Sequence, residues 1–447
     1  MDKKFIWIAG GGLLLVIILV IVLVTSSGKK PVTDTSTSSV STFTIWDYNN
    51  EKTAYDQLIQ DFQGDWKVQV NYVSKNPNTY LTDTINAIAA GNGPDVWIVP
   101  AKYMVSIKDK LLPMPDDGTQ ASRASNVQTI ANNYPLAVVT DNVFNSQIYG
   151  VPLAIDNLKL FINGAIISQK LEELKKANPS ADINALSQTY ASPKTWDEVV
   201  STSKFLTTKT NGKITQAGLA FGTANNIDNA DQLLTLIMMQ NGAKMTSDDL
   251  TSAQFHTIQN QYSNIQYPGT KALEFYAGFA DSKNANYSWD TSFPEATQAF
   301  AQGKVAMMIG DNKTAAEIKS LAPNFNFITT AIPQIANTAH PVNLADYDTL
   351  TVPKSTQNQA LSWTFILKAT DSQYANNYTR LTGKTTAANP DGQTQSWYNP
   401  DPATVTTILK TAISQVNDGK SAQTALDGAA SQITTLLYKL IQTQSTK

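Results

Sequence analysis

The chain has 447 residues, of which 42% are hydrophobic and 15% charged, with a formal net charge of −3 and no cysteine. This length suffices for two or three domains with sizeable cores. The lack of cysteine excludes disulfides, thiol catalysis and cysteine metal sites, and the lack of a basic stripe argues against a nucleic-acid partner. The only histidines are His256 and His340. We expect both to be ordinary polar residues.

The N-terminal segment predicts a membrane anchor. Residues 5–24 carry no charge, and as a helix they would extend about 30 Å, the thickness of a bilayer core. This apolar stretch is longer than that of a cleavable signal peptide, so we expect residues 1–24 to form an uncleaved anchor, with a cleaved signal as the alternative. Lysines flank the segment on both sides and do not determine its orientation. Residues 25–42 are a Ser/Thr-rich linker, with a reach of roughly 23 Å.

The next hundred residues alternate between strand and helix patterns. We expect strands at 43–48, 67–73 and 95–99, with helices near 52–63 and 80–91 between them. In the second helix Leu81, Ile85 and Ile88 share one face, and Gly91 is suited to a left-handed C-terminal cap. This β-α-β-α-β order predicts a mostly parallel α/β sheet.

Asp95 stands in "AAGNGPDVWIV", between a Gly-Pro turn and an apolar strand. It precedes the strand and would therefore lie about 13 Å from the carboxyl end, where ligands of parallel sheets bind. We predict that Asp95 accepts hydrogen bonds that fix the turn and does not touch a ligand.

Further along, the same elements return. Thr195 and Glu198 form a capping-box pattern before a helix. A strongly apolar helix ends at Gly242, and "SFPEATQAFAQGKVAMMIGD" predicts a helix, a glycine stop and a buried strand. Another amphipathic helix covers 358–370, and the last fifty residues are largely helical. We expect the Met pairs of "LIMMQ" and "VAMMIG" to fill the core.

Seven segments carry a resemblance to a known family. They are "FTIWDYNN", "INAIAAGNGPDVWIV", "YGVPLAIDNLKLFIN", "SPKTWDEVVSTSKFL", "ATQAFAQGKVAMMIGD", "TLTVPKSTQNQALSWTFIL" and "AISQVNDGKSAQTALDGAASQI". Their order and spacing resemble those of the extracellular solute-binding proteins of ABC importers, the sugar-binding family that includes maltose-binding protein.

The resemblance implies a two-lobe α/β fold of the periplasmic-binding-protein type (type II), with a hinge and a ligand cleft between the lobes. Lobe 1 would comprise residues 43–152 and 350–395, and lobe 2 residues 156–347 and 396–447. The segment "MMIGDNK" lacks the Gly-Pro-Trp found after this strand in maltose-binding protein. This departure argues against a maltodextrin in particular.

Ligands of open parallel sheets bind beyond the carboxyl ends of the strands. This rule, together with the resemblance, selects polar and aromatic residues suited to a polyol. Trp397 and Tyr398 would either close the cleft or pack before the next helix. The candidate ligand-binding residues are Trp46, Tyr48, Asn49, Asn50, Pro100, Ala101, Lys102, Asp156, Gly310, Asp311, Asp346, Tyr347, Trp397 and Tyr398.

These features favour a monomeric, membrane-tethered binding protein. It would capture a mono- or oligosaccharide outside the cytoplasm and deliver it to an ABC permease, without a cofactor or metal. One alternative is an anchored glycan-processing enzyme using a carboxylate pair from Asp47, Asp156 and Asp346. Another is a sensor or adhesion module without a permease. If the chain is a binding protein, iron, polyamines or peptides are alternative ligands.

Overall fold

The computed structural model describes residues 41–259, 266–388 and 393–445. The expected anchor and nearly all of the expected linker lie outside these residues. Within the described part, no helix is both long and apolar enough to span a membrane. The chain divides into two compact units. Unit 1 extends to Ile155 and returns for Asp346–Asp391, whereas unit 2 comprises Asp156–Ala345 and Gly392–Lys447.

Unit 1 is built around a five-stranded sheet with strand order β2-β1-β3-β14-β6. Strand β1 pairs in parallel with β2 and β3, whereas β14 is antiparallel to β3 and to β6. The parallel pairing expected for the first three strands is therefore confirmed, whereas β14 adds two antiparallel pairings to the sheet. The strands are β1 (Thr42–Asp47), β2 (Gln69–Ser74), β3 (Val96–Pro100), β4 (Val143–Phe144), β5 (Gln147–Ile148), β6 (Gly150–Val151), β7 (Ala154–Asn157), which crosses into unit 2, β14 (Asp348–Thr351) and β15 (Thr385–Thr386).

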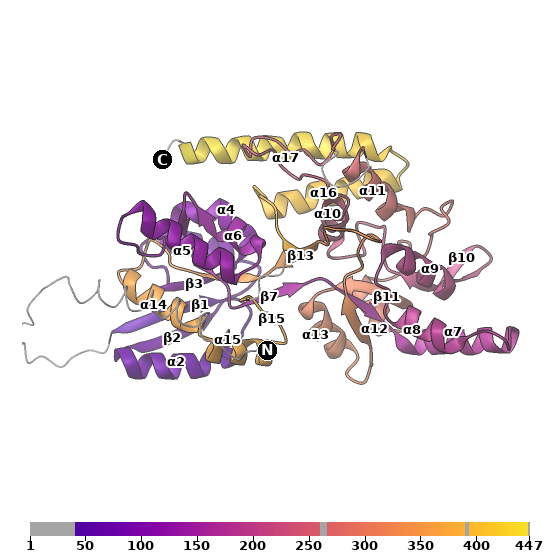
Figure 1. The fold of residues 1–447 in the computed structure, drawn as a ribbon, viewed down its shortest axis with the longest axis horizontal. Coiled ribbons are helices and arrows are strands. Elements are labelled where there is room, and N and C mark those ends of the chain that lie inside the picture. Colours follow the sequence, from indigo (N-terminus) through magenta and orange to yellow (C-terminus); the bar gives the residue numbers. More distant parts are fainter. Residues whose placement is uncertain (1–40, 260–265, 389–392, 446–447) are drawn as a thin grey trace, which may run out of the picture. The chain divides into compact units, whose positions relative to one another are not determined.

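Helices cover both faces of this sheet, with α4, α5 and α6 on one side and α2, α14 and α15 on the other (Figure 1). Three rings hold α2 and α14 against β1. Phe62 lies 5.3 Å from Phe43 and 5.1 Å from Phe365 between ring centroids, and all three side chains are fully buried. The helices are α2 (Lys52–Trp66), α3 (Tyr80–Ala89), α4 (Met104–Ile107), α5 (Gln120–Asn133), α6 (Leu136–Asn142), α14 (Gln359–Ala369) and α15 (Ser372–Thr382), with 3-10 turns η1 (Ala101–Tyr103) and η2 (Lys108–Lys110).

The expected helices and strands of unit 1 are present, with shifted ends. Helix α2 continues to Trp66, and β2 starts only at Gln69, because Lys67 adopts the left-handed conformation (φ 53°) that closes the helix. Gly91 has a φ of 77°, as its predicted capping role requires. Gly93 permits a close approach, since a Cβ there would lie 2.3 Å from the Ser355 hydroxyl oxygen.

Asp95 accepts hydrogen bonds as predicted, but its donors lie in β1 and in the segment before α14, not in the Gly-Pro turn. Its carboxylate is 9% exposed and accepts hydrogen bonds from the Thr44 amide (2.8 Å), the Thr356 hydroxyl (2.5 Å) and the Asn358 amide group (3.1 Å). Asp95 thus joins β1 and β3 to the segment that precedes α14.

Unit 2 contains a second five-stranded sheet, with strand order β12-β8-β11-β10-β9. Only β10 and β11 pair in parallel, whereas the other three pairings are antiparallel. The parallel pattern of the first three strands does not recur here, because β8 and β9 run against the strands beside them. The strands are β8 (Lys159–Ile162), β9 (Thr208–Thr210), β10 (Lys213–Leu219), β11 (Val305–Gly310), β12 (Ile328–Ala331), β13 (Asn343–Asp346) and β16 (Thr394–Gln395).

The helices of unit 2 enclose one large core. The predicted capping box of Thr195 and Glu198 starts α9, and Gly242 (φ 85°) follows α10. Met238, Met307 and Met308 are buried, which confirms the prediction that the Met pairs fill the core. The helices are α7 (Gly164–Ala177), α8 (Ile183–Ala191), α9 (Trp196–Leu206), α10 (Ala230–Gln240), α11 (Pro268–Gly278), α12 (Ala296–Ala301), α13 (Asn312–Leu321), α16 (Pro402–Asn417) and α17 (Ala422–Ser445).

Candidate functional site

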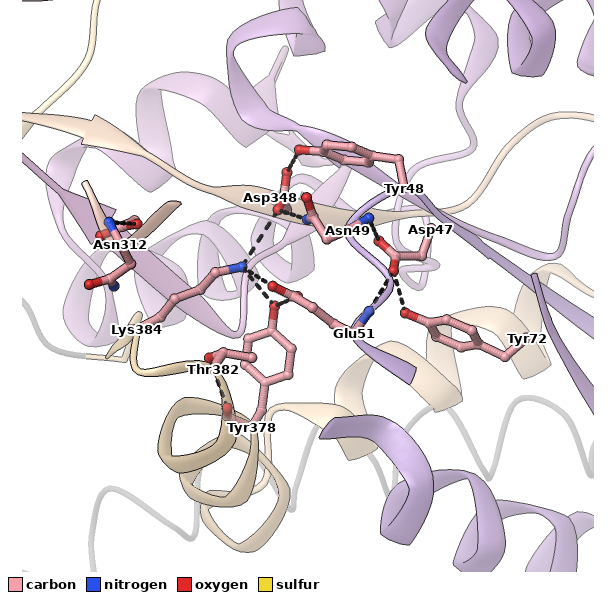
Figure 2. Close-up of polar contacts among 11 residues, drawn as sticks. Asp47, Tyr48, Asn49, Glu51, Tyr72, Asn312, Asp348, Tyr378, Thr382 and Lys384 are labelled. Atoms are coloured by element: carbon pink, nitrogen blue, oxygen red, sulfur yellow. Dashed lines mark hydrogen bonds and ion pairs between the residues drawn. The ribbon is translucent and has the colours of Figure 1, made fainter. Parts of the chain in front are cut away.

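Polar side chains gather at one edge of the unit 1 sheet, where β1 and β3 end. Because β14 is antiparallel to β3, it begins at this edge, and Asp348 is paired in register with Pro100. The loop from β1 to α2 therefore meets the start of β14, although about 300 residues separate them. Figure 2 shows the resulting cluster. We call it the carboxyl-edge cluster, and it comprises Asp47, Tyr48, Asn49, Glu51, Tyr72, Asp348, Tyr378 and Lys384.

Asp47 shapes the loop that follows β1. Its side chain is only 1% exposed and accepts bonds from the backbone amides of Asn49 (3.0 Å) and Glu51 (3.2 Å) and from the Tyr72 hydroxyl (2.7 Å). Asn50, between the two amides, adopts a φ of 57°, a left-handed conformation that asparagine tolerates better than most residues. Since Asp47 is buried and accepts three bonds, it orients the loop and is not placed to act on a ligand.

Asp348 accepts bonds from two residues of that loop. The Tyr48 hydroxyl donates to Oδ1 and the Asn49 amide group donates to Oδ2 at 2.6 Å. Burial raises the pKa of Tyr48 well above 10.0, and the charges of Asp348 and Asp346 raise it further. Tyr48 therefore stays protonated at neutral pH and acts as a hydrogen-bond donor.

Lys384 supplies the positive charge of the cluster. Its ammonium lies 2.8 Å from Glu51 Oε1, 3.2 Å from the Tyr378 hydroxyl and 3.8 Å from Asp348 Oδ2. Tyr378 in turn donates to Glu51 Oε2 at 2.5 Å. Burial raises the pKa of Tyr378 well above 10.0, with further contributions from Tyr55 and Glu51. The cluster therefore combines protonated tyrosine donors, carboxylate acceptors and one lysine.

Aromatic rings adjoin the cluster. The Trp46 ring is half-buried, and the Lys75 ammonium lies 3.9 Å from its centroid, as expected for a cation–π contact. Tyr48 packs against Tyr80 with 5.1 Å between ring centroids. An aromatic face beside carboxylates and amides is the combination that binds a sugar ring together with its hydroxyl groups.

The other residues predicted after β3 differ in exposure. Ala101 is 3% exposed, and its amide donates to the Tyr347 carbonyl at 2.9 Å. Pro100 is half-buried, whereas Lys102 is exposed. Lys102 is thus the residue of this trio whose side chain extends into solvent.

Tyr347, another predicted ligand residue, has its side chain buried inside unit 1. Its side chain is 6% exposed, and its hydroxyl donates to Asp141 at 2.7 Å and lies 3.1 Å from the Asn142 amide nitrogen. Burial, followed by the charge of Asp141, raises the pKa of Tyr347 well above 10.0. The hydroxyl therefore serves a buried network within unit 1.

In unit 2, the predicted residues Asp156, Gly310 and Asp311 meet at the start of α13. Asp156 is 8% exposed, and its Oδ2 accepts the Asn312 amide at 2.9 Å. Asp311 caps the helix through the Thr314 amide at 2.8 Å. Gly310 is required here, because a Cβ would lie 2.6 Å from the Thr314 side chain. These acids stabilise a helix start, and Asp156 Oδ1 lies 3.8 Å from the Lys159 ammonium.

Trp397 and Tyr398 follow β16. Both are half-buried and pack against the large core of unit 2. Asp401 then caps α16 through the Thr404 amide at 3.2 Å, and Pro402 occupies its first turn. Core packing occupies part of each ring and leaves the remainder exposed.

The strand-end rule thus gathers Trp46, Tyr48 and Asn49 at one edge of unit 1, but it misses Glu51, Asp348 and Lys384. Asp348 had a sequence signal, since it stands two residues after Asp346 at the head of a strand that returns to the same edge. Lys384 had none, because only tertiary structure brings a turn after α15 to this loop.

Two further observations concern metal binding and a hollow in unit 2. Among the described residues, no three His, Cys, Asp or Glu side chains are grouped so that they could hold a metal ion. A hollow of about 750 Å³ in unit 2 is lined by Trp196, Tyr267, Lys271 and Phe275, among others, and contains none of the predicted ligand residues.

Comparison with known proteins gives one family. The sequence profile of the bacterial extracellular solute-binding proteins matches residues 57–407. A search of curated proteins finds no significant match.

Several solved structures share the fold. The sugar-binding protein MalE of Xanthomonas citri is 17% identical, with a TM-score of 0.69 over 91% of this chain and 100% of that one. The GacH receptor of Streptomyces glaucescens, solved with acarbose, is 18% identical, with a TM-score of 0.63 over 90% and 99%. An ABC transporter solute-binding protein of Thermotoga lettingae, bound with tagatose, is 20% identical, with a TM-score of 0.61 over 89% and 100%. At these identities the likeness concerns the fold alone.

Proposed function

Because the chain belongs to the bacterial extracellular solute-binding protein family, we propose that it captures a carbohydrate and delivers it to an ABC permease. Members of this family bind solutes and are not enzymes. Unit 1 and unit 2 would act as the two lobes, and the ligand would be a mono- or oligosaccharide. Binding would close the lobes by a hinge motion, without making or breaking a bond.

The carboxyl-edge cluster carries this proposal. Asp348 is 11% exposed and Glu51 20% exposed, so both carboxylates retain some access to solvent. Each carboxylate oxygen can accept more than one hydrogen bond, and sugar hydroxyls are suitable donors. The half-buried Trp46 ring nearby supplies apolar surface for the other side of a sugar ring.

The sugar-bound structures of similar fold support a carbohydrate, since their ligands include tagatose, acarbose and mannobiose. The predicted ligand residues of unit 2, Asp156 and Trp397, would meet the same ligand when the lobes close. Asp47 is buried and accepts three hydrogen bonds, which argues against Asp47 as a member of the carboxylate pair that a glycan-processing enzyme would need.

We further propose that residues 1–24 tether the folded part to the outer face of the cell membrane, with residues 25–42 as a flexible linker. The uncharged residues 5–24 support this proposal. A short flexible tether would keep the binding protein near its permease at a high effective concentration.

A sugar panel tests the function. The full chain, held in detergent, is titrated with tagatose, mannobiose, maltotriose, maltotetraose and acarbose while tryptophan fluorescence and binding heat are recorded. We expect saturable binding of at least one sugar. Asp348→Asn should weaken that binding at least tenfold, because the new amide group keeps one acceptor oxygen and its nitrogen only donates, so either Tyr48 or Asn49 loses its acceptor.

Asp83→Asn is the matched control, since Asp83 is an exposed acid of the same unit, in the first turn of α3. It should leave the affinity unchanged. Absence of any response across the panel would contradict a carbohydrate ligand.

A further inference from the structure

Lys384 occupies a turn whose backbone is fixed on both sides. Gly383 (φ 73°) closes α15 immediately before it. Immediately after it, Thr385 and Thr386 of β15 pair with Ile155 and Ala154 of β7. Strand β7 is where the chain first crosses from unit 1 to unit 2, since the units divide between Ile155 and Asp156.

The side chain of Lys384 connects this turn to two other parts of unit 1. It reaches Glu51 in the loop after β1, and it reaches Asp348, at the head of β14. Asp348 follows the second crossing, between Ala345 and Asp346, by only a few residues. The Lys384 ammonium thus touches the loop after β1 and lies 3.8 Å from Asp348 of β14 (Figure 2), while its backbone adjoins β15, the partner of β7.

Partial burial makes this arrangement sensitive to change. Lys384 is 12% exposed, and its carboxylate partners are 20% and 11% exposed. Charges so poorly solvated depend on one another, and an alteration at one partner is felt by the others. When ligand hydroxyls bond to Glu51 or Asp348, the ammonium must readjust, and the adjacent β15 and β14 are positioned to register that readjustment.

We propose that Lys384 is a positioning residue that couples ligand binding at the carboxyl-edge cluster to β7 and β14, the strands at two of the three crossings between the lobes. This inference rests on the proposed function and extends it. Lys384 holds the ligand-side loop in register with β7 and β14, so that occupancy of the loop favours closure of the lobes.

Unit 1 offers a close control in Lys368 of α14. It forms an ion pair with Asp65 at 2.9 Å and lies 5.4 Å from the Tyr374 ring, whereas Lys384 lies 5.4 Å from the Tyr378 ring. The partners of Lys368, Asp65 and Tyr374, lie outside the carboxyl-edge cluster and outside β7 and β14. Removing the charge of Lys368 therefore shows how far the loss of an ion pair outside the cluster changes binding and closure.

The experiment measures affinity and closure separately. Because the chain has no cysteine, Asn78→Cys in unit 1 and Lys176→Cys in unit 2, both at exposed positions, allow specific labelling with a dye pair. Energy transfer in the full chain is followed during titration with the tightest binder of the sugar panel. The variants are Lys384→Met, Lys384→Arg and Lys368→Met, each with a melting curve to report folding.

We expect Lys384→Met to weaken binding at least tenfold and to retain less than half of the wild-type change in energy transfer at saturation. Lys384→Arg should restore most of the change, and Lys368→Met should match the wild type. If Lys384→Met does not fold, the pair Glu51→Gln and Lys384→Met, which also removes the unmatched charge, is measured instead.

A folded variant without Lys384 that shows the full change in energy transfer at saturation overturns the inference, whatever its affinity, because a plain contact or stability role would leave closure intact. Failure of the wild type to bind any sugar would instead contradict the proposed function. The two failures are therefore distinct.

Discussion

Asp95 and Asp47 stand at opposite ends of neighbouring parallel strands in unit 1, and both are almost fully buried. Asp95, before β3, accepts bonds from one backbone amide, one hydroxyl and one side-chain amide. Asp47, after β1, accepts two amides of its own loop and a tyrosine hydroxyl, and further acids and a lysine lie in the same cluster.

The difference follows from the direction of the strands. At the amino end of the sheet, Asp95 joins two strands to a neighbouring segment, and its three hydrogen-bond donors are neutral groups. At the carboxyl end the loops diverge, and one buried acid shapes the loop that presents other, more exposed acids. The same residue type therefore fixes the fold at one end and supports a candidate binding surface at the other.

The largest expected effect comes from removing the acid at the amino end. Asp95→Ala would leave the donors of Thr44, Thr356 and Asn358 without their acceptor, two of them partly buried, and should lower the free energy of unfolding by about 3 kcal/mol. Thermal and urea unfolding measure the loss. Asp83→Ala, at an exposed acid nearby, should change stability by less than about 0.5 kcal/mol.

Ligand affinity of the folded fraction should stay unchanged in Asp95→Ala, because the proposed ligand residues of this sheet lie at its other end. If Asp95→Ala instead kept normal stability and lost affinity, Asp95 would be a ligand residue and the proposed difference between the two ends of the sheet would be wrong.

Alkali should distinguish the Asp47 end of the sheet from the Asp95 end. Burial, then the charges of Tyr55 and Asp47, raise the pKa of Tyr72 far above its ordinary value of 10.0, so the folded protein keeps a proton that the unfolded chain releases. Stability is therefore fully present below pH 10 and falls as the pH rises above it, by about 1.4 kcal/mol per pH unit for each such tyrosine.

Unfolding free energies between pH 9 and pH 11 measure this slope. Tyr72→Phe should reduce the slope by one proton, whereas Asp95→Ala should retain the wild-type slope, because the donors of Asp95 do not titrate in this range. An unchanged slope in Tyr72→Phe would show that Tyr72 does not contribute.

Local patterns predict most of the fold. The helix spacing of Ile85 and Ile88, the capping box of Thr195 and the glycine stop at Gly242 all depend on residues within one or two turns, and the structure bears them out. The direction of β8 was not predictable in this way, because its partners β11 and β12 lie far away in the sequence. Strand β9 instead pairs with β10 across the adjacent Asn211 and Gly212, a local hairpin signal that the predicted strands and helices did not include.

The candidate site divides along the same line. Trp46 lies near the end of β1, and Tyr48 and Asn49 follow the strand directly, so a search at the carboxyl ends of the strands finds all three. Lys384 reaches Glu51 across 333 residues of sequence, and no local pattern signals such a contact. Tyr347 shows the opposite case. Its position near a crossing between the units made it a candidate ligand residue, but its hydroxyl donates a hydrogen bond to Asp141, 206 residues earlier, in the core.

The smallest expected effect concerns the Lys75 ammonium over Trp46, which covers part of the ring at the carboxyl end. Such a contact is worth about 0.5–1 kcal/mol, so Lys75→Met should barely change the melting temperature. If a neutral sugar stacks on the same face of Trp46, it must displace the ammonium. Lys75→Met should then bind that sugar about two- to fivefold tighter, as measured by calorimetry.

Lys209 provides the matched control, because its ammonium lies 4.7 Å from the Tyr287 ring in unit 2, and neither residue belongs to the candidate site. Lys209→Met should leave the affinity unchanged. Weaker binding in Lys75→Met would show that the lysine donates to the ligand, and the carboxyl end would then recognise its ligand with cations as well as with acids and aromatic rings.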